Sequence, residues 1–258
     1  MELIVFIFVG SVAGLMAGLL GIGGGLLTVP LMLFLLPLFG LPDAQVMHMA
    51  IATSLAAIIP TSMLSAWGHY QRGAIEWFAV RRLIPGLLLG SFFGAILASH
   101  IPKIELQLIF GIFLLFVSYK MMKNSRVKPS VTNNPIYIYI AGPLIGLISA
   151  LLGVGGGTMT VPLLNWQGVA MQKAVGSSAL CGLPIAIAGS IAFANMEILN
   201  QSTSPQQYIY LPALIGISIG SLLSVHLGVK AAHRLPAKKL KTLFSLLLLV
   251  VAVKLILF

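Results

Sequence analysis

The chain alternates between long apolar stretches and short polar segments along its whole length. Apolar runs of membrane-spanning length stand at 49–67, 83–99, 104–119, 208–227 and 242–258. An α-helix needs about 20 mainly apolar residues to traverse a hydrocarbon core of about 30 Å. The short alternating segments of a membrane β-barrel are absent from the sequence. This pattern predicts an all-α polytopic membrane protein.

Composition supports this prediction. Of the 258 residues, 59% are hydrophobic and 8% are charged, whereas about 25% of the residues of a soluble domain are charged. A chain with so few charges cannot cover a water-facing surface, so its expected surroundings are a lipid bilayer. A net charge of +10 also occurs in nucleic-acid-binding proteins, but in a membrane protein basic residues mark the cytoplasmic side. We therefore expect no nucleic acid partner.

One sequence pattern occurs twice, once in each half of the chain. Residues 14–30 read GLMAGLLGIGGGLLTVP and residues 146–162 read GLISALLGVGGGTMTVP, at an offset of 132. Both copies interrupt apolar sequence with glycines and a proline. Paired interruptions of this kind, at matching positions of two hydrophobic halves, point to the binding site of a secondary transporter.

The distribution of Lys and Arg favours one of two arrangements of the halves. Three segments, 72–82, 120–128 and 230–241, hold 12 of the 15 basic residues. If each motif merely breaks a spanning helix, the halves are parallel and the basic residues divide 8 to 7 between the two sides. If the chain reverses at each motif, the halves are inverted and the division becomes 13 to 2. The positive-inside rule favours reversal, with both termini on the non-cytoplasmic side.

The segments after the motifs are too short to cross a bilayer. Residues 29–39 and 158–167 reach only about 15–17 Å at about 1.5 Å per residue. We expect half-helices or re-entrant segments here, and a longer half-helix that includes the glycines stays open. The predicted fold has two inverted repeats, with about eight full transmembrane helices plus the two short segments. The first repeat is 1–122, a cytoplasmic linker is 123–135, and the second repeat is 136–258.

The glycine motifs are the candidate binding site. Glycines permit the positive φ and close backbone approach of a sharp reversal, and in lipid such a break must be buried or line a wet cavity. Threonine suits an N-cap and proline a first turn, so T-V-P at 28–30 and 160–162 predicts two helix N-termini deep in the membrane. Their free N–H groups and positive dipole ends favour an anion. The candidate substrate-binding residues here are Gly21, Gly23, Gly24, Gly25, Thr28, Gly153, Gly155, Gly156, Gly157, Thr158 and Thr160.

A second repeated element follows each short segment. Residues 48–54 read HMAIATS and residues 172–178 read QKAVGSS, which we expect to place a hydroxyl pair about one turn into the next helix. Such hydroxyls can donate to a bound oxyanion, or they can bond a neighbouring helix or the carbonyl four residues earlier. His48 aligns with Gln172, and both a gate or proton-linked role and a structural role are open for this pair. The candidate substrate-binding hydroxyls are those of Thr53, Ser54, Ser177 and Ser178.

Other chemistry is not indicated by the sequence. None of the five carboxylates stands in the middle of an apolar run, so the usual cation cage or acidic proton relay is not expected. No zinc-protease, phosphate-loop or kinase signature occurs. The only cysteine, Cys181, cannot form an intrachain disulfide. We expect no enzyme activity, no cofactor and no metal.

Two copies of G-[IV]-G-G-G-x-x-T-V-P and two of A-[IV]-[AG]-[TS]-S carry a family resemblance. Through them the chain resembles the TauE/SafE sulfite exporter family over nearly its whole length. The resemblance implies transport of sulfite, organosulfonates or related small oxyanions across the bacterial inner membrane, and two inverted halves imply alternating access. An anion channel of the same architecture, or transport of a small carboxylate or another sulfur compound, is the alternative. The expected partners are a small anion and the bilayer, and the oligomeric state is open, with a homo-oligomer included.

Overall fold

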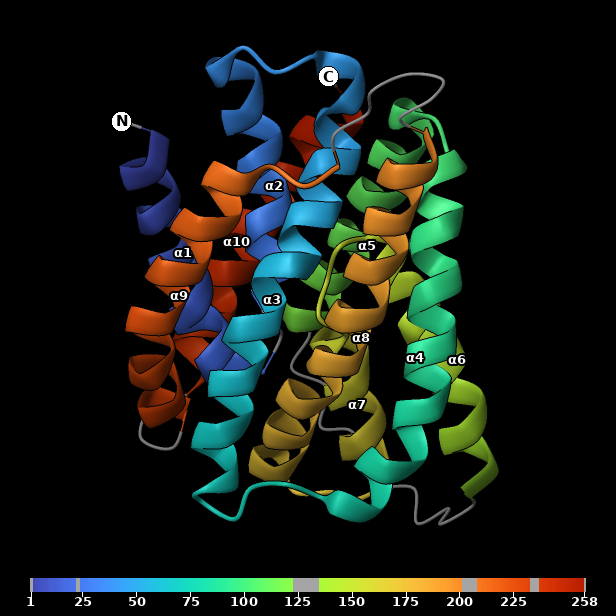
Figure 1. Ribbon diagram of the computed structural model, residues 1–258. Helices are drawn as coiled ribbons and strands as arrows, with labels where there is room; N and C mark the ends of the chain where they lie inside the picture. Colours follow the sequence, from blue (N-terminus) through green and yellow to red (C-terminus); the bar gives the residue numbers. More distant parts are fainter. Residues whose placement is uncertain (1, 22–23, 123–134, 201–207, 233–236, 258) are drawn as a thin grey trace.

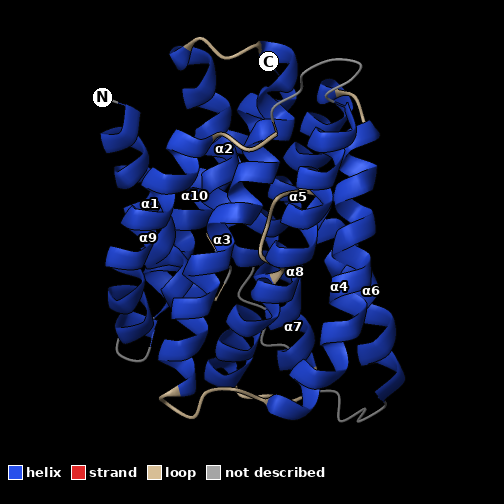
Figure 2. Cartoon of the chain, in the orientation of Figure 1, coloured by secondary structure: helices blue, strands red, loops and turns tan. Residues whose placement is uncertain are grey.

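The computed structural model describes residues 2–21, 24–122, 135–200, 208–232 and 237–257. Within these ranges the chain is helical and contains no strand (Figure 1; Figure 2), which confirms the all-α prediction. Two 3₁₀ helices, Leu36–Phe39 and Asp43–Gln45, lie between α2 and α3. The α-helices are α1 (Glu2–Leu20), α2 (Gly25–Leu35), α3 (Val46–Tyr70), α4 (Trp77–His100), α5 (Lys103–Met122), α6 (Pro135–Leu151), α7 (Gly157–Trp166), α8 (Met171–Asn200), α9 (Leu211–Ala232) and α10 (Ala237–Leu257).

Five helices of the described residues are long and apolar enough to cross a membrane, which supports a multi-pass membrane protein. They comprise Glu2–Leu19, Asp43–Tyr70, Trp77–His100, Met171–Met196 and Leu211–Ala231. The expected total of about eight full spans stays a prediction. The expected linker lies almost wholly outside the described residues.

The two glycine motifs interrupt the helices, as the sequence predicted. α2 has 11 residues and α7 has 10, and both begin at the last glycine of their motif, earlier than the expected starts at 29 and 158. In Figure 1, α1 runs from the end of the bundle marked N to its middle, and α2 turns back toward that end. From the opposite end α6 reaches the middle, and α7 turns back toward its own end.

The packing of the long helices is the same when the two halves are exchanged. α1 packs along α9, and α6 packs along α4, while α3 contacts α8 and α5 contacts α10. Glycines allow the closest of these approaches. A Cβ on Gly10 would lie 2.3 Å from the carbonyl oxygen of Ile217, and one on Gly90 would lie 2.0 Å from that of Pro143. Small residues at such crossings let helix backbones touch in a bilayer, where helices gain little from excluding lipid.

The start of α1 and the end of α10 lie at the same end of the bundle (Figure 1). A bond from the Gln107 side chain to the Leu255 carbonyl (3.0 Å) ties the first turns of α5 to the last turn of α10. This agrees with an arrangement in which both termini face one side of the membrane. Which side that is stays a prediction from the basic residues.

Candidate functional site at the two chain reversals

Each reversal is made by two glycines in the left-handed region. Gly21 (φ 66°) and Gly153 (φ 68°) close the incoming helices, and Gly24 (φ 81°) and Gly156 (φ 72°) open the outgoing ones. The left-handed region is costly for residues with a Cβ, so glycine is the residue that ends a helix this way and starts the next. Gly23, the remaining expected residue of the first motif, lies outside the described residues.

The two reversals touch each other in the middle of the bundle. A Cβ on Gly25 would lie 2.3 Å from the carbonyl oxygen of Gly153 and 3.0 Å from the Cα of Val154. A Cβ on Gly153 would meet Val29 and the backbone of Ile51 at 2.9 and 3.0 Å. The first turn of α2 therefore lies directly against the second reversal, an approach that only glycine allows at these two positions.

The caps of the short helices differ from the prediction. The N-caps of α2 and α7 are Gly24 and Gly156, whereas the sequence suggested Thr28 and Thr160. Both threonines stand at the fourth helical position, and Pro30 begins the second turn, because the left-handed glycine starts the helix four residues earlier. The third amide of each helix bonds the carbonyl of its N-cap glycine (3.0 Å for Leu27 and 3.1 Å for Met159), so only the first two amides, those of Gly25 and Leu26 and those of Gly157 and Thr158, have no partner within their own helix. These N–H groups and the dipole end point to where the reversals meet, an arrangement that attracts negative charge.

The serine of each hydroxyl pair bonds the opposite motif. Ser54 Oγ donates to the carbonyl of Gly153 (2.9 Å), and Ser178 Oγ donates to the carbonyl of Gly21 (2.8 Å). Both serines are fully buried. They lie about two turns into α3 and α8 instead of the expected one, because these helices begin at Val46 and Met171. Each bond therefore links the two halves: α3 is joined to the glycine at the end of α6, and α8 is joined to the glycine at the end of α1.

The other hydroxyl of each pair accepts a backbone N–H at the start of a long helix. Thr53 Oγ1 accepts from the amide of Tyr210 (2.9 Å), just before α9, and Ser177 Oγ accepts from the amide of Glu76 (2.7 Å), just before α4. Each bond satisfies an orphan amide of a helix start. Within the described part of the chain neither of these two buried hydroxyls donates a hydrogen bond, so neither proton is committed to a protein acceptor.

The two motif threonines have different surroundings. Thr28 Oγ1 lies 2.7 Å from Ser54 Oγ. Because Ser54 gives its only proton to Gly153, Thr28 is the donor of this pair, and both protons are used. Thr160 Oγ1 is completely buried and has no hydrogen-bond partner among the described residues. Thr158, two residues earlier, is half-buried.

A group of hydroxyls on α3 was missed by the sequence reasoning. Thr61 Oγ1 lies 2.7 Å from Ser221 Oγ of α9, and Ser62 and Ser65 are buried with no partner in the described residues. A Cβ on Gly182 would lie 2.9 Å from Ser62 Oγ and 3.0 Å from the Gly155 carbonyl oxygen, so Ser62 borders the second motif. The signal was present as T-S-x-x-S directly after Pro60, where α8 has only apolar residues after Pro184 until Ser190.

His48 and Gln172 are not part of this central cluster. His48 is half-buried near the start of α3 and bonds the Ile101 carbonyl through Nε2 (3.1 Å). Gln172 is exposed at the start of α8. The two aligned residues therefore lie at equivalent positions, each near the start of a different long helix, and not beside the reversals.

Tyr210 links one of the central hydroxyls to a charged group. Its amide bonds Thr53, and its phenol donates to the Glu2 carboxylate (2.6 Å). Burial, followed by the hydrogen bond and the charge of Glu2, raises the pKa of Tyr210 to about 12. The phenol therefore stays protonated over the physiological range and keeps donating to Glu2.

Comparison with known proteins places the chain among transporters. Residues 6–255 match the family described as sulfite exporter TauE/SafE. The chain is 36% identical over 256 residues to a probable membrane transporter protein of Haemophilus influenzae, covering 97% of both chains. It is 30% identical over 247 residues to a probable membrane transporter protein of Methanocaldococcus jannaschii, covering 94% of this chain and 91% of the other. No solved structure matches it at a significant level.

Proposed function

The chain belongs to the TauE/SafE sulfite exporter family, and on this premise we propose that it is a secondary transporter of a small oxyanion. The resemblance inferred from the repeated motifs is thereby confirmed, and the relatives are named as membrane transporters. The proposed substrate is sulfite, an organosulfonate or a related oxyanion. The proposed location is the bacterial inner membrane, with both termini on the non-cytoplasmic side.

We infer that the halves are inverted repeats that alternate in opening the centre to either side. The symmetric packing of α1 with α9 and of α6 with α4 supports this relation, as does the division of basic residues. In such transporters the substrate lies at the repeat interface, where interrupted helices present their N-terminal ends. Here two hydrogen bonds join the halves, from Ser54 to Gly153 and from Ser178 to Gly21. If one half rotates against the other during transport, these bonds break and form again.

Within this centre the substrate would meet hydroxyl and amide donors and no lysine or arginine. Among the described residues, the hydroxyls that donate no hydrogen bond include those of Thr53, Ser177, Thr160 and Ser62. A site built from neutral donors and helix ends holds an anion without trapping it, since each contribution at a helix end is only about 0.3–1 kcal/mol in exposed settings and about 2 kcal/mol in buried ones. The transport cycle requires such release.

The contact between the two reversals is the observation that carries the proposal, and glycine replacement tests it. Gly24→Val and Gly156→Val each place a β-branched residue at φ 81° or 72°, at a cost of order 1–3 kcal/mol. We expect both variants to insert into membranes and to lose substrate flux in proteoliposomes. Gly73→Ala, at a positive-φ turn with open space around it, is the control for backbone strain outside the centre and keeps its flux. Normal flux in both valine variants would remove the central site assignment.

A channel of the same architecture is the second candidate, because the same donors could line a continuous pore. Counterflow separates the two, since stimulation of uptake by unlabelled substrate on the far side is a carrier property. Competition by sulfite, methanesulfonate and acetate in the same vesicles distinguishes a sulfur oxyanion from a small carboxylate. Uptake without stimulation by substrate on the far side would favour the channel.

A further inference from the structure

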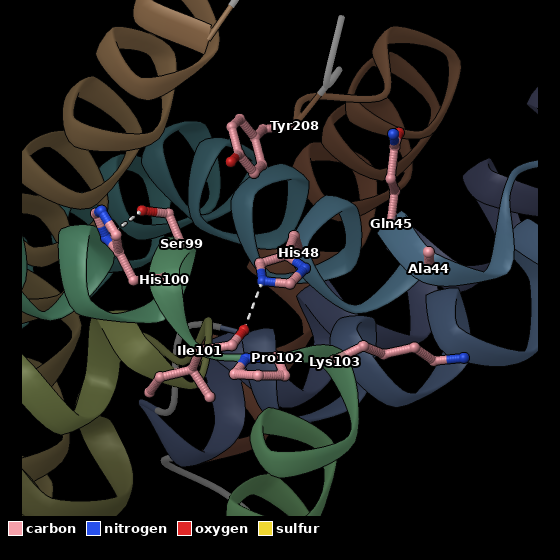
Figure 3. A pocket seen from close by; sticks show the side chains of 9 residues that line it. All are labelled: Ala44, Gln45, His48, Ser99, His100, Ile101, Pro102, Lys103 and Tyr208. Carbon is pink, nitrogen blue, oxygen red and sulfur yellow. Dashed lines mark hydrogen bonds between the residues drawn. The ribbon is translucent and has the colours of Figure 1, made fainter. Parts of the chain in front are cut away.

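A pocket with polar lining residues lies away from the reversals, where α3 begins, α4 ends and α5 begins. It has a volume of about 330 Å³. Figure 3 shows His48 in its middle, between Ile101 on one side and Tyr208 on another. Gln45, Ser99, His100 and Lys103 are the other polar residues of its lining. Neither the family description nor the relatives' names assign a role to this pocket.

The hydrogen bond of His48 fixes which ring nitrogen carries the proton. Nε2 lies 3.1 Å from the carbonyl oxygen of Ile101. A carbonyl can only accept, so Nε2 is the protonated nitrogen and Nδ1 of the neutral ring is a bare acceptor. In Figure 3 this second nitrogen turns toward the side of the pocket where Ala44 and Lys103 lie. A neutral His48 therefore presents a lone pair to the pocket, whereas a protonated one presents a charged N–H donor.

The neighbouring groups make the pocket suitable for an anion. Lys103 lines the pocket and forms an ion pair with Asp43, which lies in the 3₁₀ helix just before α3. The Lys103 side chain is 23% exposed, but that of Asp43 is 79% exposed, and a carboxylate so exposed holds its partner weakly. His100 Nδ1 is bound to the Ile96 carbonyl (2.8 Å) of its own helix. The ring of Tyr208 packs edge-on against His48 at 6.2 Å, and Glu105 of α5 does not line the pocket.

We propose that this pocket binds a small oxyanion together with one proton. The proton comes from water and goes to Nδ1 of His48, which then donates to the anion while Nε2 stays on Ile101. Lys103 supplies the second positive charge, and the Gln45 amide can donate a further bond. The oxyanion loses no atom and forms no covalent bond.

The proposed proton-linked pocket has no equivalent at the start of α8. Gln172, the counterpart of His48 in the second half, has no titratable side chain. If the pocket is the mouth of the transport path, anions are captured with a proton at one side of the membrane only. That extension rests on the proposed function, whereas binding in the pocket does not.

Calorimetry with the full-length protein in nanodiscs tests the proposal, with methanesulfonate as the probe. The charge of methanesulfonate does not change between pH 5.5 and 8, so any pH dependence belongs to the protein. We expect affinity to fall at least about fivefold from pH 5.5 to pH 8, because the proton that His48 takes up with the anion is less available at the higher pH. Titrations in two buffers of different ionisation heat should show uptake of about one proton per anion at the higher pH.

His48→Gln, which installs the residue of the other half, should abolish both the proton uptake and the pH dependence. His226→Gln, at an exposed histidine of α9 outside the pocket, is the matched control and should keep both. Lys103→Met should weaken binding at every pH and leave the proton uptake unchanged. The proposal is overturned by binding that does not depend on pH, by proton uptake that survives in His48→Gln, or by no binding at either pH.

Nitrogen NMR of the wild-type protein gives a readout that needs no variant. The neutral His48 ring should carry its proton on Nε2, and addition of methanesulfonate should shift it to the doubly protonated form. The opposite tautomer contradicts the proposal. The same titrations in Gly24→Val and Gly156→Val separate this pocket from the central site. Unchanged proton-linked binding with lost flux supports both sites, and normal flux in both variants refutes only the central site.

Discussion

The two reversals have the same backbone but differ in how their hydroxyl groups are satisfied. In the first, Thr28 donates to Ser54, and Ser54 donates to Gly153, so the chain of donors is complete. In the second, Ser178 donates to Gly21, but Thr160 has no partner within the described residues. A buried hydroxyl without a partner costs of order 1–3 kcal/mol. The hydroxyl protons of the first junction are thus used between the halves, and the second junction keeps one hydroxyl that the described residues do not satisfy, as the proposed anion site requires.

The long helices beside the reversals differ in the same direction. After Pro60, α3 continues with Thr61, Ser62 and Ser65, whereas the aligned stretch of α8 after Pro184 begins with Ile185 and Ala186. The matching segments of α3 and α8 therefore have similar backbones but different polarity. Each prediction below compares matched positions in the two halves.

The largest difference is expected between Ser54→Ala and Ser178→Ala. Ser54→Ala removes the donor of the Gly153 carbonyl and leaves the Thr28 hydroxyl only its long contact (3.5 Å) with the Gly24 carbonyl. Ser178→Ala removes a hydroxyl that is shared between the Gly21 carbonyl of the opposite half and the Val175 carbonyl of its own helix. One orphaned buried group costs about 1–3 kcal/mol, so the first variant should lose about twice the free energy of unfolding of the second. Reversible unfolding in bicelles measures both. Equal losses would contradict the assigned donor directions.

A smaller difference, with opposite signs for stability and flux, is expected from Thr28→Val and Thr160→Val. Valine keeps the shape of threonine and removes the hydroxyl. Thr28→Val removes a hydrogen bond and should lower stability by about 1 kcal/mol. Thr160→Val removes an unsatisfied group and should leave stability unchanged or raise it by up to about 1 kcal/mol, while flux falls about tenfold if Thr160 binds the substrate. Unchanged flux in Thr160→Val would mean that its hydroxyl is idle.

The hydroxyls of α3 should behave like Thr160 with a weaker effect. Ser62→Ala is expected to change stability by less than about 0.5 kcal/mol, since no partner is lost, and to reduce flux severalfold. Ala186→Ser, the reverse change at the aligned position of α8, introduces a hydroxyl among apolar neighbours and should lower stability by about 1 kcal/mol. Thermal unfolding and uptake are measured on the same preparations. A stabilised Ala186→Ser would show that both paths tolerate polarity equally.

The smallest effect concerns the ends of α4 and α9. Thr53 accepts a hydrogen bond from the amide of Tyr210, and Ser177 accepts one from the amide of Glu76. Of these two donors, Tyr210 also has a phenol, which is bound to Glu2. Because the pKa of Tyr210 is higher in the folded protein than in the unfolded chain, where it is about 10, the protonated phenol stabilises the fold below that pH. This contribution is lost as the pH rises through about 12. Wild type should therefore lose slightly more stability than Tyr210→Phe between those values. A phenolate difference spectrum between the two proteins should titrate near the upper value, and a titration near 10 would contradict the assigned environment.

The positions of the two reversals could be predicted from the glycines, because the ease with which a residue adopts a positive φ depends on the residue type itself. Gly21, Gly24, Gly153 and Gly156 carry the reversals at the repeated positions. The N-caps were misassigned because a threonine before a proline is an equally good local signal, and only the backbone shows that the glycine four residues earlier starts the helix. The partners of Ser54 and Ser178 lie 99 and 157 residues away in the sequence. No local pattern reports contacts at that separation.

The sequence by itself determined that the protein is helical and apolar, that it repeats one interrupted element, and that each interruption needs glycine. These follow from chain composition and from the dihedral angles open to each residue type. Only the tertiary structure decided which hydroxyls are used up between the halves, and that Thr160, Ser62 and Ser65 are left without a partner in the described residues. It also decided that the ring of His48 has one nitrogen held by a backbone carbonyl and the other turned to a pocket. The reason is that a hydrogen bond depends on the positions of two groups in space, and the folding of distant segments sets those positions.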